Sequence, residues 1–346
     1  MPAVFHAGPS REMHWFFLGG GGSSDFAGVR PSDDAANGNA VMYDAVNGKI
    51  LAFAGAKAFA RSEYSGMRDT VLITIQEPGQ QVQTRVVGNL NVGRVYGNAM
   101  AMPDGKVAVV GGALLPLEFD DTYAIFDPGE FLSCRRVIHM RASSASLATP
   151  LPDLLGCVKP PEERYRPVAD SSWCAAEIWD PETEEWTLIE AQHSEPRTYH
   201  STGVLLKDGR ILHGGGGLCG NVNCGGNHLD AEIFSPPYLF NSDGSLAPRP
   251  TVSLNTETVG VGGALTVTSS EPLMMISLIR YSSVTHSTNT DQRRIELCGP
   301  YSDPCPASPA TVELPDDGGI VIGGYWMLFG VNHAGVPSVA TSVLVN

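Results

Sequence analysis

The sequence lacks long hydrophobic runs and is poor in basic residues. No apolar stretch approaches the roughly 18–20 residues that a membrane-spanning helix needs. Charged residues make up 17% of the 346 residues, and 22 Lys and Arg face 37 Asp and Glu. The formal net charge of −15 argues against a nucleic-acid or anionic-membrane surface, which requires clustered basic residues. The first residues also lack the basic and apolar regions of a signal peptide.

Glycine and proline are abundant, which argues against a helix-rich fold. The chain has 39 Gly and 25 Pro, and both residue types weaken helix interiors. A hydrophobic fraction of 42% supplies a real core and excludes wholesale disorder. The length allows one large domain or two ordinary ones.

A turn of the form Asp/Asn-Gly-Lys/Arg recurs, each time between an apolar strand and a second strand that ends in glycine. It occurs at 47–49 before ILAFAG, at 104–106 before VAVVGG, and at 208–210 before ILHGGGG. Asn-Gly and Asp-Gly are typical of tight hairpins in which both central residues take positive φ. Gly48 and Gly105 are separated by about one period of roughly 50 residues, which is typical of kelch-type propeller blades.

The interval from Gly105 to Gly209 is about twice as long and predicts an insertion inside one blade. The fourth-strand pattern with a downstream Trp occurs as AEIWDPETEEW at 176–186. The Pro-containing stretch 128–174, with three cysteines and no periodicity, would be the insertion. Generic β-hairpins without propeller geometry remain the alternative.

These patterns predict an all-β chain with two domains. Residues 1–247 would form a partial kelch-type β-propeller with three blades and a fragment at 1–36. Propellers need four to eight blades to close, so we expect upstream sequence to be absent from this chain. Residues 248–346 show short alternating strands with frequent turns, which favours an immunoglobulin-like β-sandwich.

Seven cysteines include two close pairs, Cys219 with Cys224 and Cys298 with Cys305. Two local disulfides are the preferred interpretation, and they would indicate an oxidising compartment and a secreted protein. Reduced, buried thiols are the alternative. A zinc site is disfavoured because no second C-x-x-C or spaced His pair accompanies them. The pairing of the other three (Cys134, Cys157 and Cys174) stays open.

Three polar rings are candidates for a metal site. Tyr199 and His200 stand at the start of an inner strand, which in a propeller lines the central channel. His286 lies in a polar loop of the second domain, followed by a charged and amide cluster at 291–294 that is suited to fixing a loop. Imidazole suits copper, zinc and iron. Taken singly, each of these residues is more often structural.

Several long segments carry a family resemblance. The segments are RTYHSTGVLLKDGRILHGGGGLCG (197–220), NHLDAEIFSPPYLFNSDGSLAPRP (227–250), VTHSTNTDQRR (284–294), GYWMLFGVNHAGVPSVA (324–340), VFHAGPSREMHW (4–15) and GNAVMYDAVNGKIL (38–51). Together they resemble the galactose oxidase and glyoxal oxidase family of copper radical oxidases. The resemblance covers nearly the whole chain apart from 128–174.

The resemblance implies a seven-bladed kelch propeller capped by an immunoglobulin-like domain. A hairpin of the second domain would thread the channel and deliver His286 to one copper ion. His200 would be an equatorial ligand, and Tyr199 an axial ligand and general base. Such enzymes oxidise a primary alcohol or aldehyde with O2 to give hydrogen peroxide, using copper and a tyrosyl radical cross-linked to a cysteine sulfur.

The chain departs from this family pattern. The cross-linked Cys and Tyr would lie upstream of residue 4, so we expect this chain alone to be inactive, as the C-terminal portion of a longer enzyme. Phe59 and Phe119 are candidates for the substrate side. The alternatives are a non-catalytic kelch-propeller binding module and a mononuclear metal protein that uses the three rings alone. We expect a monomer acting on a small alcohol or aldehyde and O2, with neither nucleic acid nor membrane as partner.

Overall fold

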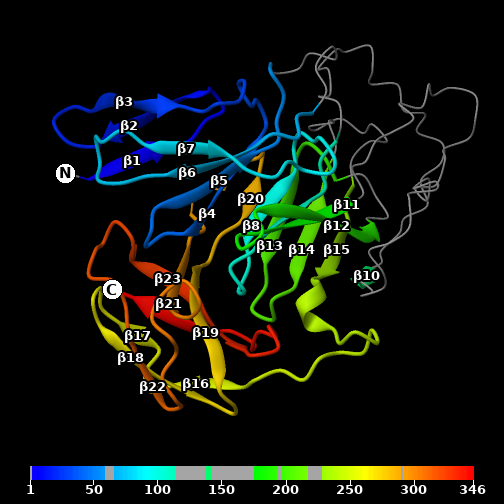
Figure 1. The fold of residues 1–346 in the computed structure, drawn as a ribbon, viewed down its shortest axis with the longest axis vertical. Coiled ribbons are helices and arrows are strands. Elements are labelled where there is room, and N and C mark those ends of the chain that lie inside the picture. Colours follow the sequence, from blue (N-terminus) through cyan, green and yellow to red (C-terminus); the bar gives the residue numbers. More distant parts are fainter. Residues whose placement is uncertain are drawn as a thin grey trace, which may run out of the picture.

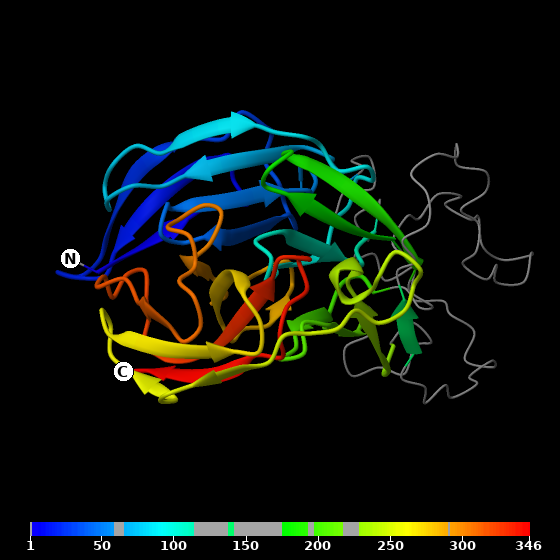
Figure 2. The same ribbon diagram turned by 60° about the horizontal axis from the view of Figure 1, so that its bottom comes forward.

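The computed structural model describes residues 2–58, 66–113, 138–141, 175–192, 197–216, 228–289 and 291–346. Within these ranges the fold is built from β-strands, with one short 3-10 helix at Pro237–Leu239, so the predicted all-β class is confirmed. None of the described helical segments is long and apolar enough to cross a membrane. Figures 1 and 2 show a row of sheets at the N-terminal side and a separate two-sheet unit formed by the C-terminal residues.

Four sheets follow one another in the row, antiparallel except for one strand pair in the fourth, and we call them blades 1 to 4 (Figure 1). Blade 1 contains β1 (Ala3–His6), β2 (Glu12–Phe17) and β3 (Ser23–Val29). Blade 2 contains β4 (Asn39–Asp44), β5 (Lys49–Phe53), β6 (Thr70–Thr74) and β7 (Gln83–Val86). Apolar clusters lie between neighbouring blades, with Trp15 and Val71 between blades 1 and 2, and Phe53 and Trp179 between blades 2 and 3. In the described residues the sheets do not close into a ring, which agrees with the predicted partial propeller.

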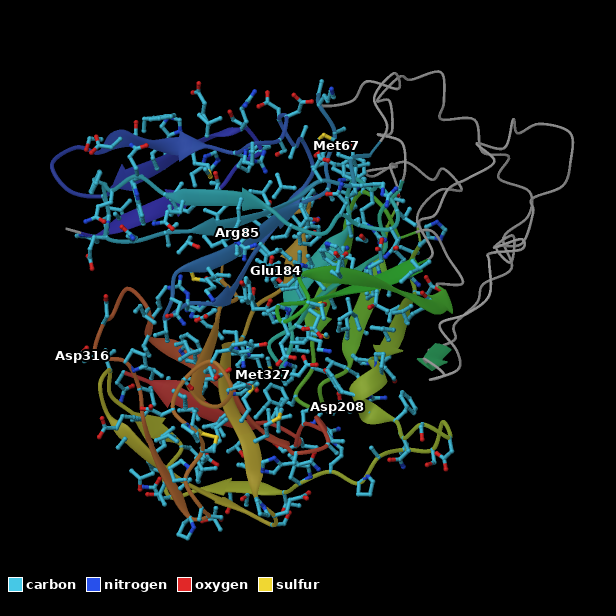
Figure 3. The ribbon with its side chains drawn as sticks, viewed as in Figure 1. Met67, Arg85, Glu184, Asp208, Asp316 and Met327 are labelled. Carbon is cyan, nitrogen blue, oxygen red and sulfur yellow. A yellow bond between two sulfur atoms is a disulfide. The ribbon has the colours of Figure 1, made fainter. Side chains whose placement is uncertain are left out.

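The second and third strands of blade 3 come from the two sides of the predicted insertion, whose bounds at 128–174 stay a prediction. The strand order of blade 3 is β8 (Asn98–Ala101), β9 (Val107–Val110), β11 (Ala175–Asp180) and β12 (Glu185–Gln192). β9 and β11, which are far apart in the sequence, pair directly as antiparallel neighbours in this sheet. Figure 3 shows Arg85 of blade 2 and Glu184 of blade 3, which form an ion pair across the two blades.

Blade 4 receives strands from distant parts of the chain. Its own strands are β13 (Ser201–Leu205), β14 (Ile211–Gly215) and β15 (Ala231–Ser235). On the outer side, β10 (Ile138–Arg141) pairs in parallel with β15, although the sequence shows no periodicity there. On the inner side, β20 (Val284–Thr285) of the C-terminal unit pairs with β13.

The recurring Asp/Asn-Gly turns are present, but their geometry differs from the prediction. Gly48, Gly105 and Gly209 have φ of 63°, 89° and 77°, whereas the preceding Asn or Asp does not take positive φ. In the second turn, the Met102 amide donates to the Lys106 carbonyl (2.9 Å), which encloses three residues. Three-residue hairpin loops of this kind need only one left-handed residue, and glycine supplies it.

The C-terminal unit consists of two facing sheets, as predicted for a sandwich. One contains β16 (Val252–Leu254), β18 (Ala264–Ser269) and β22 (Ala310–Glu313). The other contains β17 (Thr258–Val259), β24 (Thr341–Val345), β23 (Gly324–Asn332), β19 (Leu273–Arg280) and β21 (Arg294–Cys298). A shared apolar core includes Leu265, Leu278 and Trp326. The predicted Cys298–Cys305 disulfide is formed.

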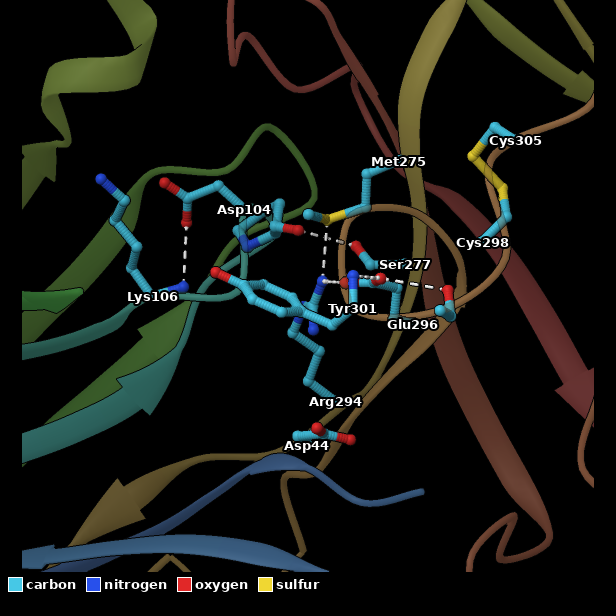
Figure 4. Close-up of polar contacts among 12 residues, drawn as sticks. Asp44, Asp104, Lys106, Met275, Ser277, Arg294, Glu296, Cys298, Tyr301 and Cys305 are labelled. Atoms are coloured by element: carbon cyan, nitrogen blue, oxygen red, sulfur yellow. Dashed lines mark hydrogen bonds and ion pairs between the residues drawn. A yellow bond between two sulfur atoms is a disulfide. The ribbon is translucent and has the colours of Figure 1, made fainter. Parts of the chain in front are cut away.

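The two units are joined through polar contacts at the turn of blade 3 (Figure 4). Ser277 on β19 donates to the Pro103 carbonyl in that turn (2.9 Å) and is completely buried. The Ala45 amide of blade 2 donates to the Arg294 carbonyl (2.9 Å), and the buried Arg294 side chain pairs with Glu296 of its own strand (3.1 Å). These contacts fix the sandwich against the blades and thereby set where the hairpin after β19 enters the propeller.

Candidate metal centre

Tyr199 and His200 lie immediately before β13, and His286 lies immediately after β20. These two strands pair antiparallel, with Thr202 opposite Thr285 and Gly203 opposite Val284. The start of one antiparallel strand lies beside the end of its partner. The sheet register therefore brings together rings that are more than eighty positions apart in the sequence.

The three rings form a compact group. The ring centroids of Tyr199 and His200 are 3.9 Å apart, those of Tyr199 and His286 5.4 Å, and those of His200 and His286 5.2 Å. Two imidazoles that bind one ion through nitrogens at about 2 Å have centroids about 4 to 6 Å apart. Both imidazoles are exposed and Tyr199 is half-buried, so the group is open to a small ligand.

Both histidines have an unusual backbone conformation. His200 has φ of 66°, His286 of 52° and the following Ser287 of 58°. Left-handed backbone is rare for residues with side chains and is enriched at functional sites, where surrounding contacts must hold it. Ser287 Oγ donates to the Asn37 carbonyl (3.0 Å), and Thr285 Oγ1 donates to the Ser201 carbonyl (3.1 Å).

The segment before β13 is anchored by a buried charged network. The Arg197 side chain is fully buried, donates to the Gly215 carbonyl (2.9 Å) and pairs with Asp230 (3.0 Å) and buried Glu232 (3.5 Å). Its own carbonyl accepts from the Gly112 amide of blade 3 (2.8 Å). Arg197 therefore fixes the backbone just before Tyr199 and His200 to both blade 4 and blade 3.

A second buried contact lies at Ser201. Asn98 of blade 3 donates to Ser201 Oγ (2.7 Å) and lies 3.0 Å from Nε2 of His213. Ser201 Oγ in turn donates to the Thr198 carbonyl (2.6 Å). All of these side chains except that of Thr198 are almost completely buried, which restricts the backbone that carries His200.

The hairpin that carries His286 contacts the inner strands of three blades. Besides the β20–β13 pairing, Asn289 donates to the Ala99 carbonyl on β8 (3.0 Å), and Gln292 accepts from the Ala101 amide (2.8 Å). The backbone of Arg293 forms an isolated parallel β-bridge with Met42 on β4. The prediction that the polar cluster at 291–294 fixes a loop agrees with these contacts.

Tyr96 was not identified from the sequence. Its ring lies edge-on to Tyr199 at a centroid distance of 5.4 Å, and its hydroxyl makes no hydrogen bond to any described residue. Burial, and secondarily the nearby Tyr199, raises the pKa of Tyr96 to about 12, so this hydroxyl stays protonated at neutral pH. The signal that could have found it is the repeated Arg-x-Tyr at 94–96 and 197–199.

The donor set fits copper in its chemistry. Two imidazole rings and one phenol ring lie beside one another, and imidazole is a good ligand for copper. Across the described ranges, this site included, no group of three or more His, Cys, Asp or Glu side chains is placed to hold a metal, so the third candidate donor here is the tyrosine. Phe59, Phe119, Cys219 and Cys224 lie outside the described residues, so their predicted roles stay predictions.

Comparison with known proteins gives two kinds of similarity. Residues 249–345 match the family described as Galactose oxidase-like, Early set domain. Galactose oxidase from Gibberella zeae is 36% identical over 99% of this chain, and aldehyde oxidase GLOX from Vitis pseudoreticulata is 34% identical over 42% of it. The alignments cover 43% and 29% of those two proteins, so the chain spans less than half the length of either.

A solved structure shows the same similarity in three dimensions. A fungal alcohol oxidase of the AA5 family, in complex with copper, superposes with a TM-score of 0.77 at 37% identity. The superposition covers 99% of this chain and 61% of that one. The resemblance that the sequence indicated is thus confirmed along nearly the whole chain.

Proposed function

From the similarity of this chain to the galactose oxidase family, which runs along nearly its whole length, we propose that it is the copper-binding portion of a copper radical oxidase. The reaction would convert a primary alcohol and O2 into an aldehyde and hydrogen peroxide. Two electrons and two protons leave the alcohol and reduce O2, so the reaction balances without another reductant. An aldehyde hydrate would be oxidised to the acid in the same way.

The observation that carries the proposal is the meeting of Tyr199, His200 and His286 at the junction of β13 and β20. His200 and His286 would hold the ion through ring nitrogens, and Tyr199 through its oxygen. When bound, copper supplies one of the two one-electron acceptors that the reaction needs. Tyr199 would accept the hydroxyl proton of the substrate as general base.

Exposure of the imidazoles leaves the open side of the site for substrate. Arg197 and Asn98 would keep the backbone of Tyr199 and His200 in place, because both side chains are buried and make hydrogen bonds before and after these two residues. The protonated Tyr96 hydroxyl would face Tyr199 as a neutral donor. Proton transfer at Tyr199 would then depend on how blades 3 and 4 position the rings of Tyr96 and Tyr199.

This chain alone would not complete the redox chemistry. A second one-electron acceptor is required, in the family a tyrosine linked to cysteine. Of the seven cysteines, the two that the structure describes, Cys298 and Cys305, are joined to each other. The same disulfide supports the proposal that the protein is exported to an oxidising compartment.

Copper binding is the first test. Titration of the metal-free chain with Cu2+ by isothermal calorimetry should show one site, and His200→Ala or His286→Ala should weaken it by more than the about 10- to 100-fold typical of changes outside the ligand shell. His333→Ala is the matched control, since His333 is an exposed histidine of the sandwich. Equal affinity in all three variants would refute the ligand set.

Peroxide release is the second test. The copper-loaded chain should give no hydrogen peroxide above buffer from galactose, glyoxal or benzyl alcohol. Turnover that His200→Ala abolishes would show that the second acceptor is present in the chain after all. A non-catalytic binding module would instead show neither copper binding nor turnover.

A further inference from the structure

Strand β21 continues directly from the hairpin that carries His286, and it is the edge strand of its sheet. The sheet order is β17-β24-β23-β19-β21, and among the described residues β21 pairs as a strand with β19 only. An edge strand has ladder hydrogen bonds on one side only, so other contacts must hold it in place. The position of β21 in turn decides where the second half of the hairpin leaves the sandwich.

Arg294, the first residue of β21, makes the contact between this strand and the blades. Its carbonyl accepts from the Ala45 amide of blade 2 (2.9 Å). Its buried guanidinium lies against the turn of blade 3, where a Cβ added to Gly105 would be 3.4 Å from Arg294 Cζ. A buried cation is costly unless an anion is fixed beside it. Here the anion is Glu296, two residues along the strand, with 3.1 Å between Arg294 Nη2 and Glu296 Oε2.

Glu296 is held in turn by the loop between Cys298 and Cys305, which we call the disulfide loop (Figure 4). Glu296 Oε1 accepts from the Tyr301 amide (2.8 Å) and from Ser302 Oγ (3.1 Å), and both donors belong to this loop. The Cys298–Cys305 disulfide joins the two ends of the loop. It therefore limits the loop to conformations that keep both donors near Glu296.

The two cysteines of the disulfide differ in their surroundings. Cys298 is 2% exposed and belongs to the apolar core of the sandwich. Cys305 is only partly buried and lines a groove of about 800 Å³ between the β18–β19 connection and the disulfide loop. Thiol–disulfide exchange begins with attack of a thiolate on one sulfur, and access decides which sulfur is attacked. Access from the groove favours attack on Cys305, with Cys298 as the leaving group.

We propose that Glu296 and the disulfide loop position the hairpin that carries His286, and that a dithiol reductant releases this restraint. In the oxidised chain the loop holds Glu296, and Glu296 holds Arg294 against the blades. In the reduced chain the loop donors leave Glu296, so Arg294 loses its fixed partner and the hairpin becomes more mobile. The restraint concerns the hairpin itself, and only its consequence for copper rests on the proposed function.

The release is an ordinary two-electron exchange. One thiolate of the reductant bonds to Cys305 Sγ as the bond between the two cysteines breaks, and Cys298 leaves as a thiolate. The second thiol of the reductant then displaces Cys305. The reductant loses two electrons as its own disulfide forms, and the two cysteines gain two electrons and two protons.

The test uses the full metal-free chain and residue-resolved hydrogen exchange. The Ala101 amide on β8 donates to Gln292 Oε1 (2.8 Å), so its exchange rate reports whether the hairpin stays in contact with β8. Dithiothreitol should speed exchange at Ala101 by about tenfold or more, because the acceptor becomes mobile. The neighbouring Met100 amide points to β9, since backbone groups alternate along the ladder, and should change little. Unchanged exchange at Ala101 would overturn the proposal. Equal acceleration at both amides would also overturn it, because that would be general destabilisation.

A double variant separates this disulfide from the other cysteines. In Cys298→Ser/Cys305→Ser, the Ala101 amide should exchange fast without any reductant, and dithiothreitol should add nothing. A further acceleration by dithiothreitol would assign the effect to another cysteine pair and overturn the proposal.

Two single substitutions test Glu296 while the disulfide stays intact. Ser302→Ala removes one hydroxyl donor to Glu296 and should speed exchange at Ala101, by a smaller factor than reduction does. Ser308→Ala is the matched control, because its Oγ contacts the backbone of Ser269 in the same groove and not Glu296. Equal exchange rates at Ala101 in these two variants would contradict the role of Glu296.

Copper titration of the double variant distinguishes this proposal from the proposed function. Its Cu2+ affinity should fall about tenfold, as for changes outside the ligand shell. Fast exchange at Ala101 with unchanged copper affinity would refute His286 as a copper ligand and leave the restraint standing. Copper binding that requires His200 and His286, together with an Ala101 amide that does not respond to the disulfide, would refute only the restraint.

Discussion

Blades 3 and 4 share the buried arginine that anchors the inner strand, but only blade 4 carries candidate metal ligands. Blade 3 reads Arg-Val-Tyr-Gly-Asn at 94–98, and blade 4 reads Arg-Thr-Tyr-His-Ser at 197–201. Arg94 is buried, pairs with buried Glu177 and donates to the Gly111 carbonyl (3.0 Å), just as Arg197 does with Glu232 and the Gly215 carbonyl. The repeated part is therefore the anchor of the inner strand.

The difference lies in one position and its backbone. Blade 3 has Gly97 where blade 4 has His200, and the left-handed residue is Tyr96 in blade 3 (φ 61°) but His200 in blade 4 (φ 66°). The inner edges also differ, since amide side chains of Asn289 and Gln292 cover β8 while strand β20 covers β13. Blade 4 therefore differs from blade 3 by the imidazole of His200 and by strand β20 of the C-terminal unit, and these two features make it the candidate metal site.

The largest expected effect comes from the buried anchors. Arg94→Ala or Arg197→Ala should each lower the free energy of unfolding by about 3–5 kcal/mol, because a buried carboxylate loses its partner. Arg197→Ala should also weaken Cu2+ binding, and Arg94→Ala should do so much less. Urea unfolding and copper titration measure the two effects. Arg85→Ala is the control, with a loss below about 1 kcal/mol because the Arg85–Glu184 pair is exposed. Equal copper affinity in both anchor variants would contradict the comparison.

Placing an imidazole on blade 3 should not create a second site. A Cβ at Gly97 would lie 3.0 Å from Val109 Cγ2 and 3.3 Å from Arg94 Cδ. Gly97→His should therefore cost about 1–3 kcal/mol in the free energy of unfolding, as overpacking does. Calorimetry should still find one copper ion. Gly318→His, at an exposed position with open space, is the control. A second equivalent of bound copper in Gly97→His would show that blade 3 is as competent as blade 4.

Removing a contact that holds the hairpin should weaken copper binding by His286, although His286 itself is unchanged. Gln292→Ala removes the contacts with the Ala101 amide (2.8 Å) and carbonyl (3.4 Å), and we expect Cu2+ affinity to fall about tenfold. Gln81→Ala also removes an amide contact with a backbone carbonyl, but that contact joins the β6–β7 connection of blade 2 to Phe26 of blade 1 and does not involve the hairpin. Its copper affinity should stay normal. If both variants bind copper equally, the hairpin does not position His286.

The smallest expected effect concerns pH. Burial raises the pKa of Tyr96 to about 12, above the value of about 10 in the unfolded chain. The unfolded state then releases the Tyr96 proton first, so the contribution of Tyr96 to stability is complete below about pH 10 and declines as the pH rises toward 12. The decline should be shallower in Tyr96→Phe, by urea unfolding between pH 9 and pH 12. Parallel curves for the two proteins would mean that Tyr96 titrates normally.

Much of the fold was predictable because local chemistry and side-chain periodicity act over short distances. The glycine-ended strands at 49–53, 107–110 and 211–215 formed as the repeat predicted, and so did β11 and β12 around Asp180. The short strands at 258–259 and 284–285 were missed, because two residues carry no alternation. The strand at 138–141 was also missed, since its partner β15 lies far away in the sequence.

The all-β class, the recurring blade unit and the disulfide between Cys298 and Cys305 could be predicted from the sequence, and the family resemblance gave the three rings as candidates. Hydrophobic alternation, turn residues and cysteine spacing encode such features locally. That His286 reaches Tyr199 and His200 was expected from the family resemblance alone, because the meeting depends on the register of β20 on β13 and on the packing of the hairpin against three blades, which the fold shows. Only the tertiary structure decided that Tyr96 lies against Tyr199. This contact follows from how whole sheets stack, which no single segment of the sequence contains.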